Sequence, residues 1–333
     1  MLLVAAALTS CKNKKNTPDV SDIKIDLQVL RHEQDFFNAD TSNLVQVLDS
    51  LQNKYGGFNR DFIYGIVGIE PFEDSVISKL PRFITDYKSV YNESKKTLTN
   101  IDEEVKIIKH GLQLTKHYFP KYNLPVKLMT CIGPINSESA FIGVDYIGIG
   151  LQMYMGKGYS LYNSEMMQRD YPAYITRRFE KQYIPVNAIK TIVEDINTND
   201  YENSIVGKSL VEQMIDAGRK LYVLDKLLPD VADTLKTGYT TAQLQGSYDN
   251  EASIWSFFVQ NDLLFSTDPN IIKDYMNDAP FTQALGEASP GFIGQFTGWQ
   301  IVKKWMEKND KKALDELLKT SPKQIFEEAK YKP

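Results

Sequence analysis

Most of the chain repeats apolar residues with the period of an α-helix. Between residues 41 and 119, four segments place apolar side chains three or four positions apart, which predicts helices that each bury one face. In the first segment, Thr41 or Ser42 is placed to cap a helix and Gly56 to end it. This half of the chain is therefore predicted to pack as a helical bundle.

The period changes from helical to alternating between residues 124 and 155. Residues 125–133 alternate and end at Gly-Pro, and residues 139–156 are rich in Ile, Tyr, Phe and Val, with a turn expected at Val144-Asp145. These features predict a small sheet of about three strands. The segment 24–30 is a candidate for completing it.

Helical patterning returns after the sheet. Residues 172–183 and 185–196 each begin with a proline suited to a first helical turn, and residues 204–228 form the longest periodic stretch, which Pro229 ends. Four more helical segments reach the C-terminus. The pattern predicts a predominantly helical α+β fold with the small sheet around residues 124–155 packed against helices. Since no linker or repeat interrupts residues 23–333, we expect one domain there.

Composition and charge exclude some classes of protein. Apolar residues make up 42% of the chain and charged residues 24%, which is typical of a globular protein. The formal net charge is -5 and no basic stripe occurs, which excludes the electrostatic surface of a nucleic-acid-binding protein. No apolar stretch after residue 11 is long enough to span a bilayer, so we expect any membrane attachment at the N-terminus.

The N-terminus has the pattern of a lipidated export signal. Seven apolar residues, Leu2 to Leu8, lead into Leu-Thr-Ser-Cys, which resembles the bacterial lipoprotein signal that attaches lipid to the cysteine, here Cys11. We expect residues 1–10 to be removed and residues 11–22 to form a lipidated, flexible tether to a membrane. Export signals have a Lys or Arg before the apolar run, and none lies between Met1 and Leu2 here. We therefore expect that translation of the natural protein starts upstream of Met1. The other cysteine, Cys131, is expected to be buried in a strand as a free thiol.

No familiar catalytic or cofactor motif is present. His110 and His117 are seven residues apart rather than the four of a zinc-binding helix, and no nucleophile elbow, P-loop or C-x-x-C occurs. We therefore predict no cofactor and no enzyme activity. Glu212, Asp216 and Arg219 share one face of the longest helix, where they form either an ion-pair network at the edge of the core or a polar site in a cleft. The same two interpretations apply to Glu251 and Trp255.

Four blocks of sequence, residues 146–162, 171–192, 209–230 and 288–306, are similar in order and spacing to those of the GldB-type gliding motility lipoproteins of Bacteroidetes. This resemblance covers most of residues 23–310 and the lipidated start. It implies a cell-envelope lipoprotein that faces the periplasm, takes part in cell movement over surfaces, and works with proteins of the gliding and adhesin-secretion machinery. A non-catalytic role is the interpretation that it favours.

The same blocks are distantly similar to zincin-like predicted metallopeptidases, which implies a zincin-like outline. The helix expected after the sheet reads Arg-Arg-Phe-Glu-Lys-Gln-Tyr in place of H-E-x-x-H, and Ala217 takes the place of the acidic ligand. Two alternatives remain: a degenerate zincin-like hydrolase using carboxylates such as Glu180, Glu212 or Glu251, and a ligand-binding lipoprotein whose pocket contains Tyr159, Tyr162 and Tyr171. The residues proposed to line a cleft are Arg178, Glu180, Glu212, Asp216, Arg219, Glu251 and Trp255.

Overall fold

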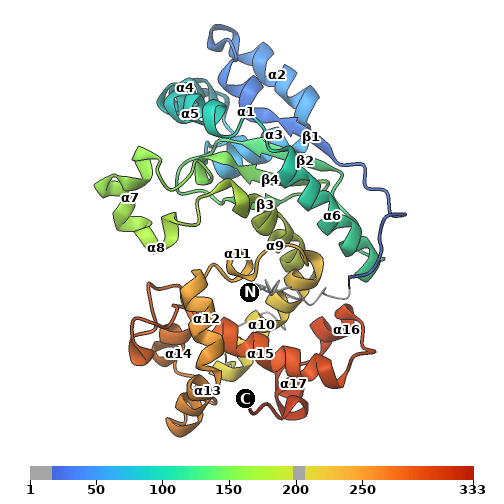
Figure 1. Ribbon diagram of the computed structural model, residues 1–333. Helices are drawn as coiled ribbons and strands as arrows, with labels where there is room; N and C mark the ends of the chain where they lie inside the picture. The colour runs from blue at the N-terminus through green and yellow to red at the C-terminus, as the bar shows by residue number, and fades with distance from the viewer. Residues whose placement is uncertain (1–16, 198–206) are drawn as a thin grey trace, which may run out of the picture.

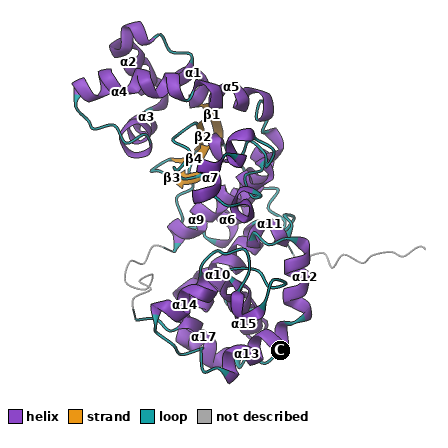
Figure 2. Ribbon diagram, turned by 90° about the vertical axis from the view of Figure 1, so that its left-hand side faces the viewer, coloured by secondary structure: helices purple, strands orange, loops and turns teal. Residues whose placement is uncertain are grey.

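The computed structural model describes residues 17–197 and 207–333. Cys11, the predicted signal segment and the first half of the predicted tether, residues 11–16, lie outside the described residues. Val20, near the end of that tether, is already buried in the core. As Figure 1 and Figure 2 show, the part that contains the sheet lies above a second, wholly helical part.

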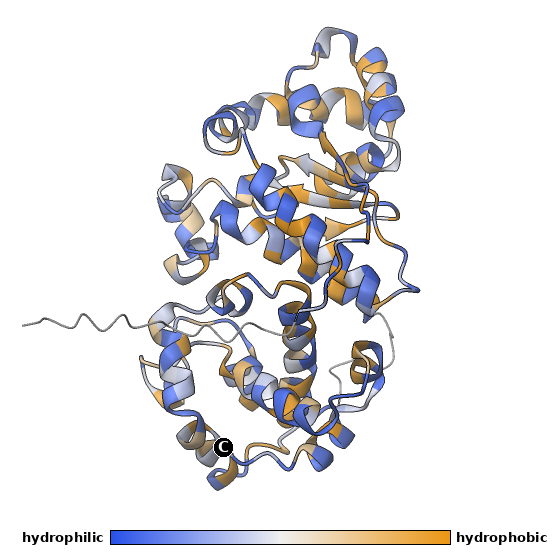
Figure 3. Cartoon of the chain, turned by 45° about the vertical axis from the view of Figure 1, so that its right-hand side comes forward, coloured by the Kyte–Doolittle hydropathy of each residue, from blue (hydrophilic) through white to orange (hydrophobic). Residues whose placement is uncertain are grey.

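The sheet has four strands in the order β1-β2-β4-β3. Strand β1 (Gln28–Arg31) runs parallel to β2 (Lys127–Cys131), which runs parallel to β4 (Tyr146–Gly150). The edge strand β3 (Ala140–Ile142) is antiparallel to β4. All five residues of β4 are buried, as expected for a parallel strand covered on both faces, and the strands are correspondingly apolar in Figure 3. The predicted sheet, its turn at Val144-Asp145 and its fourth strand are thus confirmed.

Helices cover the two faces of the sheet. One group lies on the side of α1: α1 (His32–Phe37), α2 (Leu44–Tyr55), α3 (Gly57–Arg60), a π-helical turn (Asp61–Ile66), α4 (Glu73–Asp86) and α5 (Lys88–Thr97). On the opposite side, α9 (Ile184–Ile196) packs on β3 and β4, and α6 (Asp102–Tyr118) packs on α9. The short helices α7 (Glu165–Asp170) and α8 (Ala173–Thr176) lie in the connection from β4 to α9.

The second part is built around two long helices that cross closely, α10 (Leu210–Leu227) and α15 (Ile293–Lys308). Gly218 of α10 faces Gly298 of α15, and a Cβ on either glycine would clash with backbone atoms of the other helix. The remaining helices surround this pair: α11 (Asp233–Thr237), α12 (Thr241–Asp249), α13 (Glu251–Gln260), α14 (Pro269–Met276), α16 (Leu314–Lys319) and α17 (Pro322–Ala329).

The predominantly helical α+β class is confirmed, whereas the zincin-like outline remains a prediction. Two local predictions are wrong. Neither Thr41 nor Ser42 caps α2: both lie in a 3-10 turn (Thr41–Asn43) that precedes it, and this turn is capped by the Asp40 carboxylate, which accepts a hydrogen bond from the Ser42 N–H at 3.0 Å. The helix expected over residues 172–183 ends at Thr176, because the chain then turns so that the Phe179 carbonyl accepts a bond from Gly156 N at 2.9 Å. The helix that packs on the sheet is α9 instead.

Candidate functional site

A cavity of about 430 Å³ lies where α9 of the sheet-containing part meets α10 of the helical part. Helix α10 lines the cavity with one face, because its lining residues recur every three or four positions. They are Gln213, Asp216, Ala217, Lys220, Leu221 and Leu224. The other lining residues are Lys190, Val193 and Glu194 of α9, then Lys236, Met276, Asn277, Phe292 and Gln295. A volume of this size is typical of a small-ligand pocket.

Local sequence fixes the two walls of this cavity. Pro185 occupies the first turn of α9, where its missing N–H costs no hydrogen bond. Helix α10 begins with a capping box, in which the Glu212 carboxylate accepts a 2.8 Å bond from the Ser209 N–H. The side chains of Lys190 and Lys220 are thereby presented to the cavity from two rigid helices.

A second cavity of about 270 Å³ adjoins the first, because both are lined by Lys190, Met276, Asn277, Phe292 and Gln295. Arg177 and Arg178 line the second cavity but not the first. Arg178 forms an ion pair with Asp278, and Arg177 donates to the Gly238 carbonyl at 2.8 Å. Gly238 is in the left-handed region, at φ 73°, and a Cβ there would lie 3.0 Å from Arg178 Nη1. A glycine thus allows the arginines to approach this turn.

Positive charge is concentrated along the two cavities. Burial and the nearby charge of Arg178 lower the pKa of the Lys190 ammonium and of the Arg177 guanidinium. Lys190 is half-buried, and within the described ranges its Nζ has no hydrogen bond and no carboxylate within 4.0 Å. Glu194 and Asp278 act on Lys190 only from a longer range, raising its pKa. The ammonium is thus incompletely compensated.

Of the triad predicted on the longest helix, Asp216 and Arg219 form an ion pair, and Glu212 lies apart from them. Asp216 lines the cavity, but its carboxylate is held by Lys208 at 2.7 Å and by Arg219. Arg219 is 2% exposed and donates two 2.8 Å bonds to the carbonyls of Leu318 and Thr320. Glu212 belongs to the helix cap. Arg219 and Glu212 therefore have structural contacts, and only Asp216 of the three faces the cavity.

The other predicted site residues lie in separate places. Arg178 lines the second cavity, whereas Glu180 accepts a bond from Lys157 N at 3.0 Å and pairs by backbone with Met155. Glu251 accepts a bond from the Tyr331 hydroxyl, and the Trp255 ring packs edge-on against Tyr331 at 5.0 Å. The sequence pattern therefore identified two residues of the cavities, Arg178 and Asp216, and five that lie elsewhere.

The three tyrosines of the predicted pocket belong to an aromatic cluster, and Tyr159 also lines a cavity of about 560 Å³ together with residues of α5. Tyr162 is fully buried and packs edge-on against Tyr159 and Phe179, with ring centroids 5.1 and 5.0 Å apart, and Tyr171 packs against Phe179 at 5.7 Å. Burial raises the pKa of all three hydroxyls. These rings stabilise the connection before α9.

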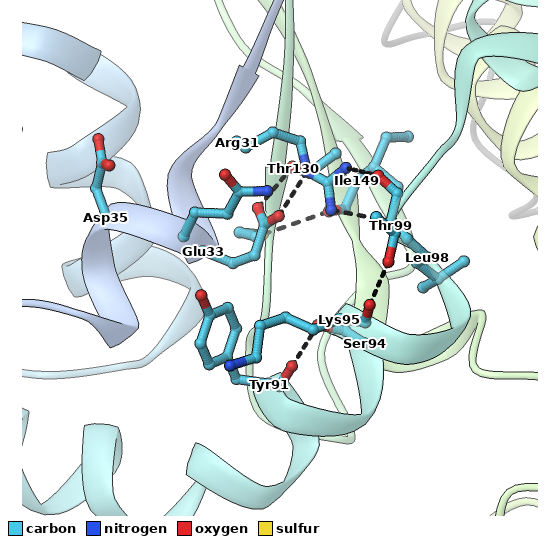
Figure 4. Close-up of polar contacts among 12 residues, drawn as sticks. Arg31, Glu33, Asp35, Tyr91, Ser94, Lys95, Leu98, Thr99, Thr130 and Ile149 are labelled. Atoms are coloured by element: carbon cyan, nitrogen blue, oxygen red, sulfur yellow. Dashed lines mark hydrogen bonds and ion pairs between the residues drawn. The ribbon is translucent and has the colours of Figure 1, made fainter.

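A buried polar network holds one end of the sheet together (Figure 4). Glu33, 1% exposed, accepts 2.6 Å bonds from Arg31 Nε and from Thr130 Oγ1, and Arg31 also donates to the Leu98 carbonyl at 3.1 Å. Both carboxylate oxygens of Glu33 therefore have partners. Cys131, next along β2, is buried as predicted and is a free thiol whose pKa burial raises well above its usual value.

Within residues 17–197 and 207–333, the structure contains no group of three or more His, Cys, Asp and Glu side chains arranged to hold a metal ion. His32 is instead enclosed by the rings of Phe36, Tyr55, Phe58 and Phe62, with centroids 4.7 to 5.2 Å away. Desolvation there lowers its pKa to about 4. No helix in the same ranges is both long and apolar enough to cross a membrane.

The residues that sequence reasoning missed are Lys190 and Lys220. One signal for Lys190 was available, because it falls between Val186 and Val193 on the buried face of an otherwise apolar helix. A lysine at such a position indicates either a buried partner or an opening. Lys220 carried no comparable signal, because its opening exists only after α9 has packed beside α10.

Comparison with known families gives a match over residues 13–333 to the family described as gliding motility protein GldB. The match covers both walls of the cavity and nearly the whole chain. No curated protein and no solved structure matches the chain.

Proposed function

Since the chain belongs to the family of gliding motility protein GldB, which implies a part in gliding motility, we propose that it is a lipid-anchored, non-catalytic component of the gliding machinery. In this proposal the folded body faces the periplasm and works with the proteins that secrete adhesins. The family match is the observation that carries the assignment.

Attachment through lipid is supported by the sequence around Cys11. Each buried methylene of an acyl chain contributes about 0.8 kcal/mol, and one chain gives only reversible binding. The two or three chains of a bacterial lipoprotein hold a protein on the bilayer essentially permanently. Partners in the machinery would then meet this protein in two dimensions, which favours assembly at modest affinity.

The non-catalytic part of the proposal is supported by the contacts of the candidate carboxylates. Glu212 serves a helix cap, Glu251 accepts from Tyr331, and Asp216 is neutralised by two cations. A general acid or base needs a proton position that a substrate can reach, and these groups are already engaged. The cavity itself favours binding as the further property of this body.

Complementation in a gliding bacterium that lacks its own GldB gene tests the proposal. The wild-type chain and the doubly substituted chain Glu180→Gln, Glu251→Gln should restore spreading and surface adhesin equally, whereas Cys11→Ser should not. Circular dichroism of the purified variants checks that they fold. Loss of spreading by a folded carboxylate variant would instead support the hydrolase alternative, and restoration by Cys11→Ser would remove the lipid anchor from the proposal.

A further inference from the structure

The charged residues that line the two cavities are not balanced. Arg178 is paired with Asp278, Lys236 with Asp225 and Asp233, and Asp216 with Lys208 and Arg219. Within the described parts of the chain, the amino groups of Lys190 and Lys220 have no hydrogen bond or ion pair. The remaining lining carboxylate, Glu194, is exposed and forms no ion pair there either. In the lining of the first cavity, two cations without a counter-charge, Lys190 and Lys220, therefore stand beside one solvated anion, Glu194.

The two free amino groups differ from ordinary surface lysines. Both side chains are half-buried and line one cavity, Lys190 from α9 and Lys220 from α10. Each ammonium has therefore lost part of its hydration without gaining a carboxylate. For Lys190 the consequence is the lowered pKa described above. A bound anion would supply a negative counter-charge to both ammonium groups. Its hydrogen bonds to them would be strong, because they are charge-assisted and the site is partly desolvated.

The rest of the cavity selects against a bare inorganic ion. Val193, Leu221, Leu224, Met276 and Phe292 form an apolar wall. The Gln213 amide uses its Nε2 to donate to the Lys208 carbonyl at 3.1 Å, which leaves its Oε1 as an acceptor. A ligand that matches these groups has an anionic end, an apolar side chain and an N–H donor. A peptide carboxylate has all three.

We propose that the cavity between α9 and α10 binds a short peptide through a carboxylate held by Lys190 and Lys220, with an apolar side chain against α10 and the start of α15. The carboxylate is either a chain terminus or an acidic side chain. The binding site does not depend on the motility role, because the proposal rests on the geometry of the cavity alone. Its partner would be a protein tail or an envelope peptide of that chemistry.

Isothermal titration calorimetry with the purified full chain tests this proposal. The probes are acetyl-Ala-Leu-Leu with a free carboxylate, the same peptide as its C-terminal amide, acetyl-Glu-Leu-Ala amide, and inorganic phosphate. We expect at least one carboxylate peptide to bind and the neutral amide to bind about tenfold or more weakly, since a hydrogen bond to a charged group contributes about 1.5–3 kcal/mol. Tighter binding of acetyl-Ala-Leu-Leu would indicate that the site binds a chain-terminal carboxylate, and tighter binding of acetyl-Glu-Leu-Ala amide that it binds an acidic side chain.

Two variants locate the site. Lys190→Gln and Lys220→Gln should each weaken binding of the carboxylate peptide about tenfold, while Lys311→Gln, which removes an exposed lysine elsewhere, should leave it unchanged. Neither lysine has an ion-pair partner that its replacement would leave unpaired. Both cavity variants should therefore have a thermal unfolding midpoint no lower than that of the wild type. Absence of binding by every peptide at millimolar concentration, equal binding by the variants, equal binding of the neutral amide, or stronger binding of phosphate would each overturn the proposal.

Discussion

The carboxylate of Glu33 accepts a 2.6 Å hydrogen bond from Thr130 Oγ1, although 97 residues separate the two positions in the chain. Glu33 lies in α1 directly after strand β1, and Thr130 lies in β2, its parallel neighbour. The contact therefore closes the long connection formed by α1 to α6. Because Arg31 binds the other oxygen, the buried charge is compensated from two strands.

Replacement of Glu33 by alanine should lower the free energy of unfolding by about 3 kcal/mol or more, because it leaves Arg31 and Thr130 without their shared partner. Thr130→Val removes a single hydroxyl and should cost about 1–2 kcal/mol. Urea unfolding followed by circular dichroism measures both values. The matched control is Glu103→Ala: the Glu103 side chain is 75% exposed, so its removal should change the free energy of unfolding by less than about 0.5 kcal/mol. A Glu33 variant no less stable than this control would contradict a structural role for the network.

His32 should make the protein unstable in mild acid. Its pKa is about 4 in the folded chain against 6.5 when exposed, so between these values the unfolded chain binds more protons than the folded chain. Stability is therefore fully present above pH 6.5 and decreases as the pH falls toward 4, by about 3 kcal/mol in total. In His32→Gln the decrease over this interval should be smaller by about that amount, as measured by urea unfolding at a series of pH values.

The control for this titration is His117→Asn, because His117 is exposed at the end of α6. Its pH dependence should match that of the wild type. If His32→Gln retains the same slope as the wild type, the acid sensitivity arises from other groups and the buried histidine is not its cause.

The crossing of α10 and α15 should tolerate no side chain at its centre. Gly298→Ala places a methyl group against the Met214 carbonyl, so the helices must separate or the backbone must shift. We expect a loss of about 3 kcal/mol in thermal or urea unfolding, at the upper end of overpacking effects. Gly158→Ala is the matched control, since no atom lies within 4 Å of its Cβ position and its backbone conformation suits alanine. Equal stability of the two variants would show that the crossing is not tightly packed.

Lipidation at Cys11 predicts the mass of the N-terminal peptide and the loss of membrane attachment when Cys11 is replaced. The mature polypeptide should begin at Cys11 and have acyl chains on that residue, which mass spectrometry of its N-terminal peptide measures. Cys11→Ser should move the protein from the membrane fraction to the soluble fraction, whereas Cys131→Ser should not, because Cys131 is buried in β2. An unmodified N-terminal peptide from membrane-bound protein would exclude this form of attachment.

Several elements followed from local sequence alone. Pro229 follows the end of α10 as predicted, and Gly56 ends α2 in a conformation that glycine adopts readily. The alternating segments around Cys131 gave the strands. In each of these cases the deciding interactions lie within a few residues, so the sequence pattern contains them. The failed helix over residues 177–183 is different, because there the chain follows a contact with Gly156.

The sequence by itself determined the helical periodicity, the small sheet, the buried Cys131 and the pattern that predicts an anchor at Cys11. Only the tertiary structure decided that Arg219 is also bound to the carbonyls of Leu318 and Thr320, and that Lys190 and Lys220 line one cavity without a counter-charge. The reason is physical. A helix pattern shows which face is apolar, but the compensation of a charge depends on groups brought from distant parts of the chain, and no local rule predicts which charges remain unpaired.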